Sequence, residues 1–319
     1  MKAYPKYRTY EEAGKQPSVL TQKYPSPSFE ANEKYYPINE LLEPLFSSRE
    51  ESRKFGAANF CGFLGDTIEV EHCVVMPAVA ALRRLPYDIP PQAEQDLFKT
   101  ATDEGYHAEQ ALKFLTDLRG HFGLSAAREY CAPLFLRRLE SQRSREDNPI
   151  YRDLITVLNA VVTETRISVE LGKFAADISL AKAVREVCKS HADDEAIHAS
   201  QFKALGEWLW EAFDETTRGA AASFITESTI ARNSLDVERI ALFFHQATGR
   251  SIPESERTVL SLYTSDLLID HLNVTARPTV ILLRDLGIDQ YLPFSDAVHC
   301  EKERLEIELT AKKAALEPG

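Results

Sequence analysis

Residues 180–213, LAKAVREVCKSHADDEAIHASQFKALGEWLWEAF, form the most informative stretch of this sequence. Apolar residues recur three or four positions apart along it, a spacing that predicts a long amphipathic helix. His191, Glu195 and His198 lie on the same stripe as the apolar residues. Burying an ionisable side chain is costly unless that side chain is paired or binds a metal. The stretch therefore predicts a helix that places metal ligands in a protein core.

The same Glu-x-x-His spacing occurs earlier in the chain, at Glu104 and His107. Residues three apart project from one face of a helix, about one turn from each other, so both side chains can reach the same ion. One such motif arises readily by chance on a solvent-exposed helix, and Glu69 with His72 forms a third copy, so the count alone is not decisive. The copies at Glu104 and Glu195 each lie in an apolar helix. Asp103 and Asp194 directly precede the motif glutamates, and we expect them to accept hydrogen bonds from ligand histidines.

Each of the two motifs is preceded by an apolar helix that a glutamate interrupts. Glu164 is the single charged member of an apolar stripe in residues 150–177. In the first helical segment the candidates are Glu69 and Glu71, and the periodicity does not choose between them. A Glu-x-x-His motif from each of two helices, with one glutamate from each of two others, is the ligand pattern of four-helix di-iron carboxylate proteins. Four carboxylates would neutralise two divalent ions, and carboxylates with imidazoles but no thiolate suit iron or manganese.

Helix-forming residues at helical spacing dominate the chain from residue 50 onward, whereas no segment has a convincing strand pattern. We therefore predict an all-α fold with one helical domain over residues 46–319. Residues 1–45 contain six of the 16 prolines and six of the 12 tyrosines, which predicts an extended N-terminal arm. Five long helices are expected, at residues 53–85, 91–119, 126–142, 150–177 and 180–213.

The composition argues against several classes of function. The formal net charge is −12, which disfavours binding to nucleic acid or to an anionic membrane surface. The longest apolar run, residues 73–82, is about half the length of a membrane span. The first residues lack the apolar core of a signal peptide, and five cysteines without zinc-type spacing are typical of reduced thiols. We therefore expect a soluble cytoplasmic protein with no nucleic-acid or membrane partner.

The complete set of spacings resembles that of the di-iron N-oxygenases related to p-aminobenzoate N-oxygenase, over about 130 residues. His191 is the specific part of this resemblance, because ferritins, ribonucleotide reductase small subunits and acyl desaturases use a scaffold with two histidines. The family register also selects Glu69 over Glu71. The resemblance implies a ferritin-like or ribonucleotide-reductase-like helical bundle with a di-iron site in its four-helix core. The implied ligands are Glu69, Glu104, His107, Glu164, His191, Glu195 and His198.

The same resemblance implies a monooxygenase that oxidises a primary amine to a hydroxylamine, and further to nitroso or nitro forms. Its cofactors would be two iron ions, with O2 as co-substrate and a peroxo-diferric intermediate. Members are homodimers of natural-product pathways, including antibiotic biosynthesis, and they need an external electron donor such as a ferredoxin or a reductase. The amine can be aryl, alkyl or carrier-bound. The alternatives are a di-iron oxygenase or desaturase acting on carbon, whose relatives lack the third histidine, and a ferritin-like iron-binding protein.

Small or apolar residues lie about one turn before the expected ligands, where they would leave room for an apolar substrate body. Arg277 or Arg284, in the last third of the chain, could hold a carboxylate of the substrate. The residues expected to line the substrate pocket are Cys61, Gly65, Ile68, Ala101, Ala160 and Val161.

Overall fold

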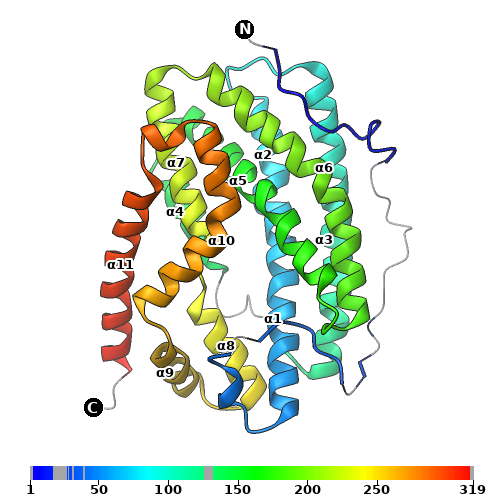
Figure 1. The fold of residues 1–319 in the computed structure, drawn as a ribbon, viewed down its shortest axis with the longest axis vertical. Helices are drawn as coiled ribbons and strands as arrows, with labels where there is room; N and C mark the ends of the chain where they lie inside the picture. Colours follow the sequence, from blue (N-terminus) through cyan, green and yellow to red (C-terminus); the bar gives the residue numbers. More distant parts are fainter. Residues whose placement is uncertain are drawn as a thin grey trace.

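The structure of the protein is a computed structural model in which residues 3–16, 27, 29–30, 32–38, 40–125 and 132–316 are described. Helices make up nearly all of its regular structure, as Figure 1 shows. Within the described residues the only β-type pairing is an isolated bridge between Lys34 and Leu180, so no sheet forms there. The predicted all-α fold is confirmed.

The helices follow one another with short connections. Their bounds are α1 Arg49–Val70, α2 Met76–Leu82, α3 Pro91–Phe122, α4 Leu134–Ser144, α5 Pro149–Ala176, α6 Lys182–Ala212, α7 Glu215–Asn233, α8 Val237–Thr248, α9 Ile252–Leu262, α10 Ser265–Asp285 and α11 Phe294–Ala315. Three short helical segments complete the set, namely a π-helix η2 at Glu71–Val75 and 3-10 turns η1 at Glu43–Leu45 and η4 at Ile288–Gln290.

Three of the five predicted helices agree with α3, α5 and α6 to within three residues at each end. The predicted helix at 53–85 instead begins at Arg49, because the Ser48 side chain accepts a hydrogen bond from the Glu51 backbone and caps the first turn. The predicted helix at 126–142 is wrong at its start. Residues 126–131 lie outside the described part of the chain, and α4 begins only at Leu134, directly after Pro133.

Four helices form the centre of the molecule. Helix α5 packs along α6, and α1 packs along α3, while η2 contacts both α3 and α5 (Figure 1). Their inward faces contribute to two separate apolar clusters. On α6, for example, Val184 and Cys188 belong to one cluster, whereas Phe202 and Leu205 belong to the other. The buried residues between these two positions are therefore enclosed by apolar layers on both sides.

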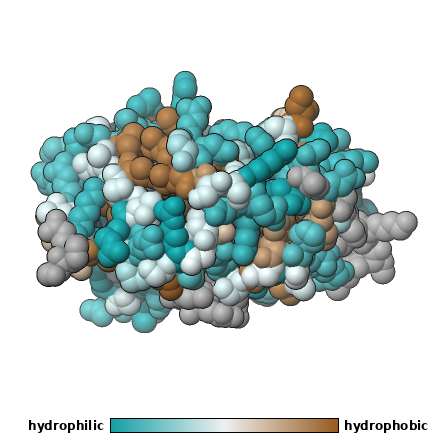
Figure 2. Space-filling view, turned by 90° about the horizontal axis from the view of Figure 1, so that it is seen from below, coloured by the Kyte–Doolittle hydropathy of each residue, from teal (hydrophilic) through white to brown (hydrophobic). Residues whose placement is uncertain are grey.

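The remaining helices extend this centre on one side, where α7, α10 and α11 lie away from α3 and α6 (Figure 1). Viewed from the end that holds α8 and α9, hydrophilic residues cover most of the surface and apolar residues gather in separate patches (Figure 2). Among the described helices none combines the length and the apolar composition that a membrane span requires. The division into an arm at 1–45 and one domain at 46–319 stays a prediction.

Candidate metal centre

The structure brings together six of the seven side chains predicted as ligands. They come from α3, α5 and α6, and each is buried, with exposed fractions of 0 to 6%. Potential ligand atoms converge in two groups, in each of which all atoms lie within 4.8 Å of one another. The first group contains Glu71, Glu104, His107, His191 and Glu195, and the second contains Glu104, Glu164, Glu195 and His198. Glu104 and Glu195 belong to both groups, so each is placed to bridge two ions.

The selection of Glu69 over Glu71 is not supported by the structure. Glu71 is fully buried and faces the cluster, with one carboxylate oxygen 3.9 Å from Nε2 of His191. Glu69 is partly exposed, lies 3.4 Å from Sγ of Cys73, and lines a different cavity. We therefore replace Glu69 by Glu71 in the candidate ligand set.

The reason is the angular position of each residue on α1. Residues at i and i+2 point about 200° apart on a helix, so Glu69 and Glu71 cannot face the same helices. The inward stripe of α1 runs through Phe60, Leu64 and Thr67, spaced four and three residues apart, and Glu71 is the next position in that series. The π-helix that begins at Glu71 then shifts the register of the residues that follow. The burial of Phe60, Leu64 and Thr67 selects Glu71, and this burial comes from the structure, because the segment is apolar nearly all round in sequence.

Several carboxylate oxygens of the cluster lack a hydrogen-bond partner in the described part of the chain. Both oxygens of Glu71 and of Glu164 are buried without one, as is one oxygen of Glu195. Unsatisfied buried polar atoms are rare in folded proteins, and each calls for an explanation. Here five of them face one region between two apolar layers, which fits a site that holds cations.

The electrostatics of the cluster lead to the same conclusion. Burial raises the pKa of Glu71 and of Glu164 well above the usual range, and the negative charge of Glu195 and Glu104 adds to the effect. Burial also opposes ionisation of Glu104 and Glu195, yet the adjacent His198 holds the pKa of both below the usual range. Without a cation the cluster must bind protons to limit its negative charge, so four carboxylates here match the charge of two divalent ions.

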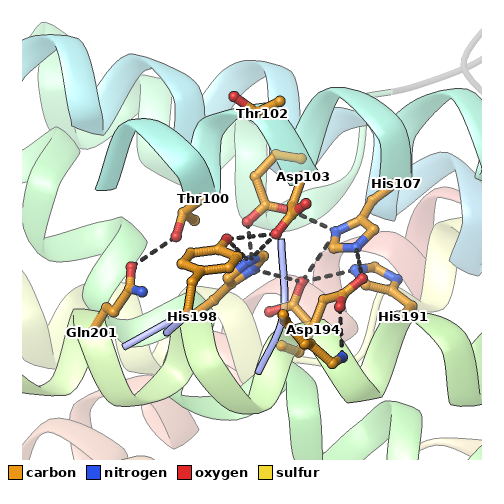
Figure 3. A network of polar contacts seen from close by, with 12 residues as sticks. Thr100, Thr102, Asp103, His107, His191, Asp194, His198 and Gln201 are labelled. Atoms are coloured by element: carbon orange, nitrogen blue, oxygen red, sulfur yellow. Dashed lines mark hydrogen bonds and ion pairs between the residues drawn. The ribbon is translucent and has the colours of Figure 1, made fainter. Parts of the chain in front are cut away.

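The two predicted aspartates lie against histidines of the cluster, each on the opposite helix. Oδ2 of Asp194 on α6 is 3.4 Å from Nε2 of His107 on α3, and Oδ2 of Asp103 on α3 is 3.2 Å from Nε2 of His198 on α6 (Figure 3). In both histidines the other nitrogen, Nδ1, faces the glutamates, at 2.8 Å and 2.9 Å from oxygens of Glu104. A carboxylate on Nε2–H fixes the ring orientation and leaves the Nδ1 lone pair free for a metal.

The six residues predicted for the substrate pocket fall into two sets. Cys61, Gly65 and Ile68 line a cavity of about 480 Å³ between α1 and α3, together with Glu69 and His72. Ala101, Ala160 and Val161 instead pack in or against the apolar cluster that includes Phe202, so they line none of the described cavities. The two arginines proposed as carboxylate clamps, Arg277 and Arg284, are exposed on α10, and the side chain of Arg284 pairs with Asp289.

Sequence reasoning missed a different cavity close to the cluster. A void of about 10 Å³ touches His107 and His191 and is lined on its other side by Phe63 and Thr67. Phe63 and Thr67 also line a cavity of about 190 Å³ on the far side of α1. Three arginines and three acidic residues from four helices and their flanking loops line this cavity, namely Asp66, Arg166, Glu170, Arg232, Asp236 and Arg239.

A four-helix core with two Glu-x-x-His motifs, two further glutamates and a third histidine is the arrangement typical of helical carboxylate proteins, and the cluster here is able to bind metal. The comparison with protein families agrees, because the model of the p-aminobenzoate N-oxygenase AurF family matches residues 44–250. This chain belongs to that family, which is a family of oxygenases. The comparison with curated proteins found no match.

Proposed function

We propose that this protein is an O2-dependent di-iron N-oxygenase that converts a primary amine to a hydroxylamine, with nitroso and nitro compounds as possible later products. The observation that carries the proposal is the third histidine. His191 is buried, its Nε2 lies 2.8 Å from a carboxylate oxygen of Glu195, and its ring lies close to that of His107, with centroids 3.9 Å apart and planes tilted by 41°. The two-histidine scaffolds that act on carbon or store iron have no counterpart to this residue. The ligands proposed are Glu71, Glu104, His107, Glu164, His191, Glu195 and His198.

The reaction is R–NH2 + O2 + 2 e⁻ + 2 H⁺ → R–NHOH + H2O, and the electrons come from an external donor such as a ferredoxin or a reductase. Bound iron would supply the activation of O2 for attack by the nitrogen lone pair. The chain itself would hold the two ions with side chains from four helical segments, and it keeps Nδ1 of both motif histidines directed inward. The apolar clusters on either side exclude water, which protects a reactive oxidant from side reactions.

We propose that the amine reaches the site through the cavity lined by Arg166, Arg232 and Arg239. Phe63 and Thr67 separate this cavity from the void beside His107 and His191, so a modest movement of the Phe63 ring would connect the two. Charged side chains suit a polar amine better than the long hydrocarbon chain of a desaturase substrate. Homodimer formation and a role in natural-product biosynthesis are further parts of the proposal, taken from the family resemblance, and a cytoplasmic location is proposed from the composition.

A single turnover tests the reaction class. The protein is loaded with ferrous iron without oxygen and then mixed with O2 and a panel of aryl and alkyl amines, and mass spectrometry detects hydroxylamine, nitroso and nitro products. Oxidised nitrogen on any amine supports the proposal, and oxidation at carbon would favour the alternative. Failure of the wild-type protein to bind iron would refute the metal-site assignment itself.

A further inference from the structure

The described N-terminal segment, residues 3–16, lies across α3 and α6 on the outside of the bundle (Figure 1). It contributes no candidate ligand, yet it contacts both aspartates that face the motif histidines. We propose that this segment, which we call the arm segment, positions the metal centre, and that Tyr10 and Lys15 are its positioning residues. The inference rests on the metal site of the proposed function and assigns a role to a part of the chain outside the ligand motifs.

Tyr10 joins the pair formed by Asp103 and His198. Its side chain is only 2% exposed, and its hydroxyl donates to Oδ2 of Asp103 at 2.5 Å. The same hydroxyl oxygen lies 3.0 Å from Nε2 of His198. Tyr10, Asp103 and His198 thus contact one another pairwise. Nε2–H of His198 faces the Tyr10 hydroxyl oxygen and the Asp103 carboxylate, and the hydrogen bond between Tyr10 and Asp103 holds these two groups in place.

Lys15 does the same for the second pair. Its ammonium group lies 2.8 Å from Oδ1 of Asp194, while Oδ2 of that carboxylate faces Nε2 of His107 at 3.4 Å. The Lys15 side chain is about one third exposed, so its charge is partly screened, and its main effect is on the orientation of the carboxylate. Each aspartate is therefore held between one histidine of the cluster and one residue of the arm segment.

A single tight turn presents both residues. Thr9 and Glu12 exchange hydrogen bonds, with each backbone N–H donating to the side chain of the other, as in a helix capping box. The backbone N–H of Lys15 donates to the Tyr10 carbonyl oxygen at 2.9 Å, and Gly14 adopts a left-handed conformation with φ of +65°. These contacts fix the spacing between Tyr10 and Lys15, so one docked turn reaches both aspartates.

The turn is anchored on either side of the site by contacts that do not involve the histidines. The Tyr7 hydroxyl donates to Asp96 on α3 at 2.9 Å, and the Arg8 backbone N–H donates to the Ser200 hydroxyl on α6 at 2.8 Å. Tyr7 provides a matched control for Tyr10, because both are tyrosines of the arm segment that donate to a buried aspartate of α3. Asp96 lies seven residues, about two turns, before Asp103, and its hydrogen-bond partners are Tyr7, Gln92 and Lys99 rather than a histidine.

The test is Co²⁺ binding to the full metal-free chain, measured by competition with a chromophoric chelator and by the visible absorption of the bound cobalt. Removing an outer partner of a metal ligand typically weakens binding by about 10- to 100-fold. Since Tyr10 and Lys15 act through an aspartate, we expect a loss of about tenfold in Tyr10→Phe and in Lys15→Met, with a shifted cobalt spectrum. Tyr7→Phe removes an anchor of the arm segment but no contact to the aspartates that face the histidines, so it should keep the wild-type cobalt spectrum and lose clearly less affinity than Tyr10→Phe. Lys15→Arg should restore most of the affinity that Lys15→Met loses. Equal Co²⁺ affinities and spectra in Tyr10→Phe and Tyr7→Phe would overturn the inference.

Linkage provides a second test on the unaltered protein. If docking of the arm segment raises metal affinity, metal binding must strengthen docking by the same factor. Trypsin should then cleave after Lys15 about ten times more slowly in the Co²⁺-loaded protein than in the metal-free protein. The same cleavage rate in both forms would contradict the inference, while normal Co²⁺ binding in that experiment would leave the proposed function intact. Absence of Co²⁺ binding in the wild type would refute both.

Discussion

Replacing Glu71 with glutamine should stabilise the metal-free protein and, at the same time, weaken its binding of metal. Glu71 is fully buried, and neither of its carboxylate oxygens has a hydrogen-bond partner within the described residues. Its pKa is raised well above the usual range by burial and by the negative charges of Glu104 and Glu195. The folded metal-free protein therefore keeps the proton on this carboxyl to a higher pH than the unfolded chain does.

The sign of the effect follows from that difference. A carboxyl whose pKa is raised on folding opposes folding at any pH above its unfolded pKa. Because the folded pKa is the higher one, the cost is absent below the unfolded pKa and grows as the pH rises towards the folded pKa. Glutamine has no such cost, so the metal-free Glu71→Gln protein should be more stable than the wild type at pH 7, and the difference should shrink at pH 5.

The assay is urea unfolding of the metal-free wild type, Glu71→Gln and Glu69→Gln at both pH values, repeated after addition of Fe²⁺ without oxygen. Glu69→Gln is the matched control, because it changes the same group two residues away on the partly exposed face of α1. The wild type and Glu69→Gln should become more stable on metal addition, and Glu71→Gln should respond much less. If Glu69→Gln rather than Glu71→Gln gains stability and loses the metal response, the placement of Glu71 in the cluster is wrong.

Three other predictions concern catalysis, packing and thiol chemistry. His191→Ala should fold and retain iron but lose or redirect amine oxidation, and unchanged product formation in a single turnover would count against a seven-ligand site. Gly206→Ala should lower the free energy of unfolding in urea by about 1–3 kcal/mol, because a Cβ there would lie 2.9 Å from a valine of α5. In the control Gly172→Ala the new Cβ meets nothing within 4 Å, so the free energy of unfolding should rise by up to about 1 kcal/mol. Equal effects of the two substitutions would show that the α5–α6 contact is looser than the structure indicates. Alkylation at pH 8 should modify the exposed Cys73 but not Cys61, because burial raises the pKa of the Cys61 thiol to about 12. Rapid labelling of Cys61, located by mass spectrometry of peptides, would refute its burial.

Most of the metal centre could be predicted from the sequence because its ligands repeat at helical spacing. Glu164, Glu195 and His198 are charged or polar members of otherwise apolar stripes, and burial makes such positions informative. The helix and loop between the first ligand and Glu104 are a different case. The resemblance to the family indicates which helix carries the first ligand but does not fix its position to the residue, because a loop can gain or lose residues without moving the helices it joins. The buried stripe through Leu64 and Thr67, which only the structure reveals, favours Glu71.

The arm segment and the charged cavity could not be predicted in the same way. Tyr10 and Asp103 are 93 residues apart, and nothing in the spacing of either segment indicates that they meet. Arg232 and Arg239 flank the cavity only because α7 and α8 fold back onto α1 and α5. Contacts of this kind depend on tertiary packing rather than on a periodic pattern, so a single sequence does not encode them in a form that can be read locally.

The repeated motif has a further consequence for how α3 and α6 align. In each copy, Asp-Glu-x-x-His, the aspartate contacts the histidine of the opposite helix rather than its own, so Asp103 pairs with His198 and Asp194 with His107. Sliding one helix along the other by a single turn, about 5.4 Å, would break both pairs together and would separate Glu104 and Glu195, which belong to both ligand groups, from the other members. The two aspartates therefore fix the register of the helices as well as the orientation of the rings. Because the arm segment holds both aspartates, its docking acts on the whole α3–α6 pair, and Tyr10→Phe should perturb the geometry at both metal positions rather than only the one nearest His198.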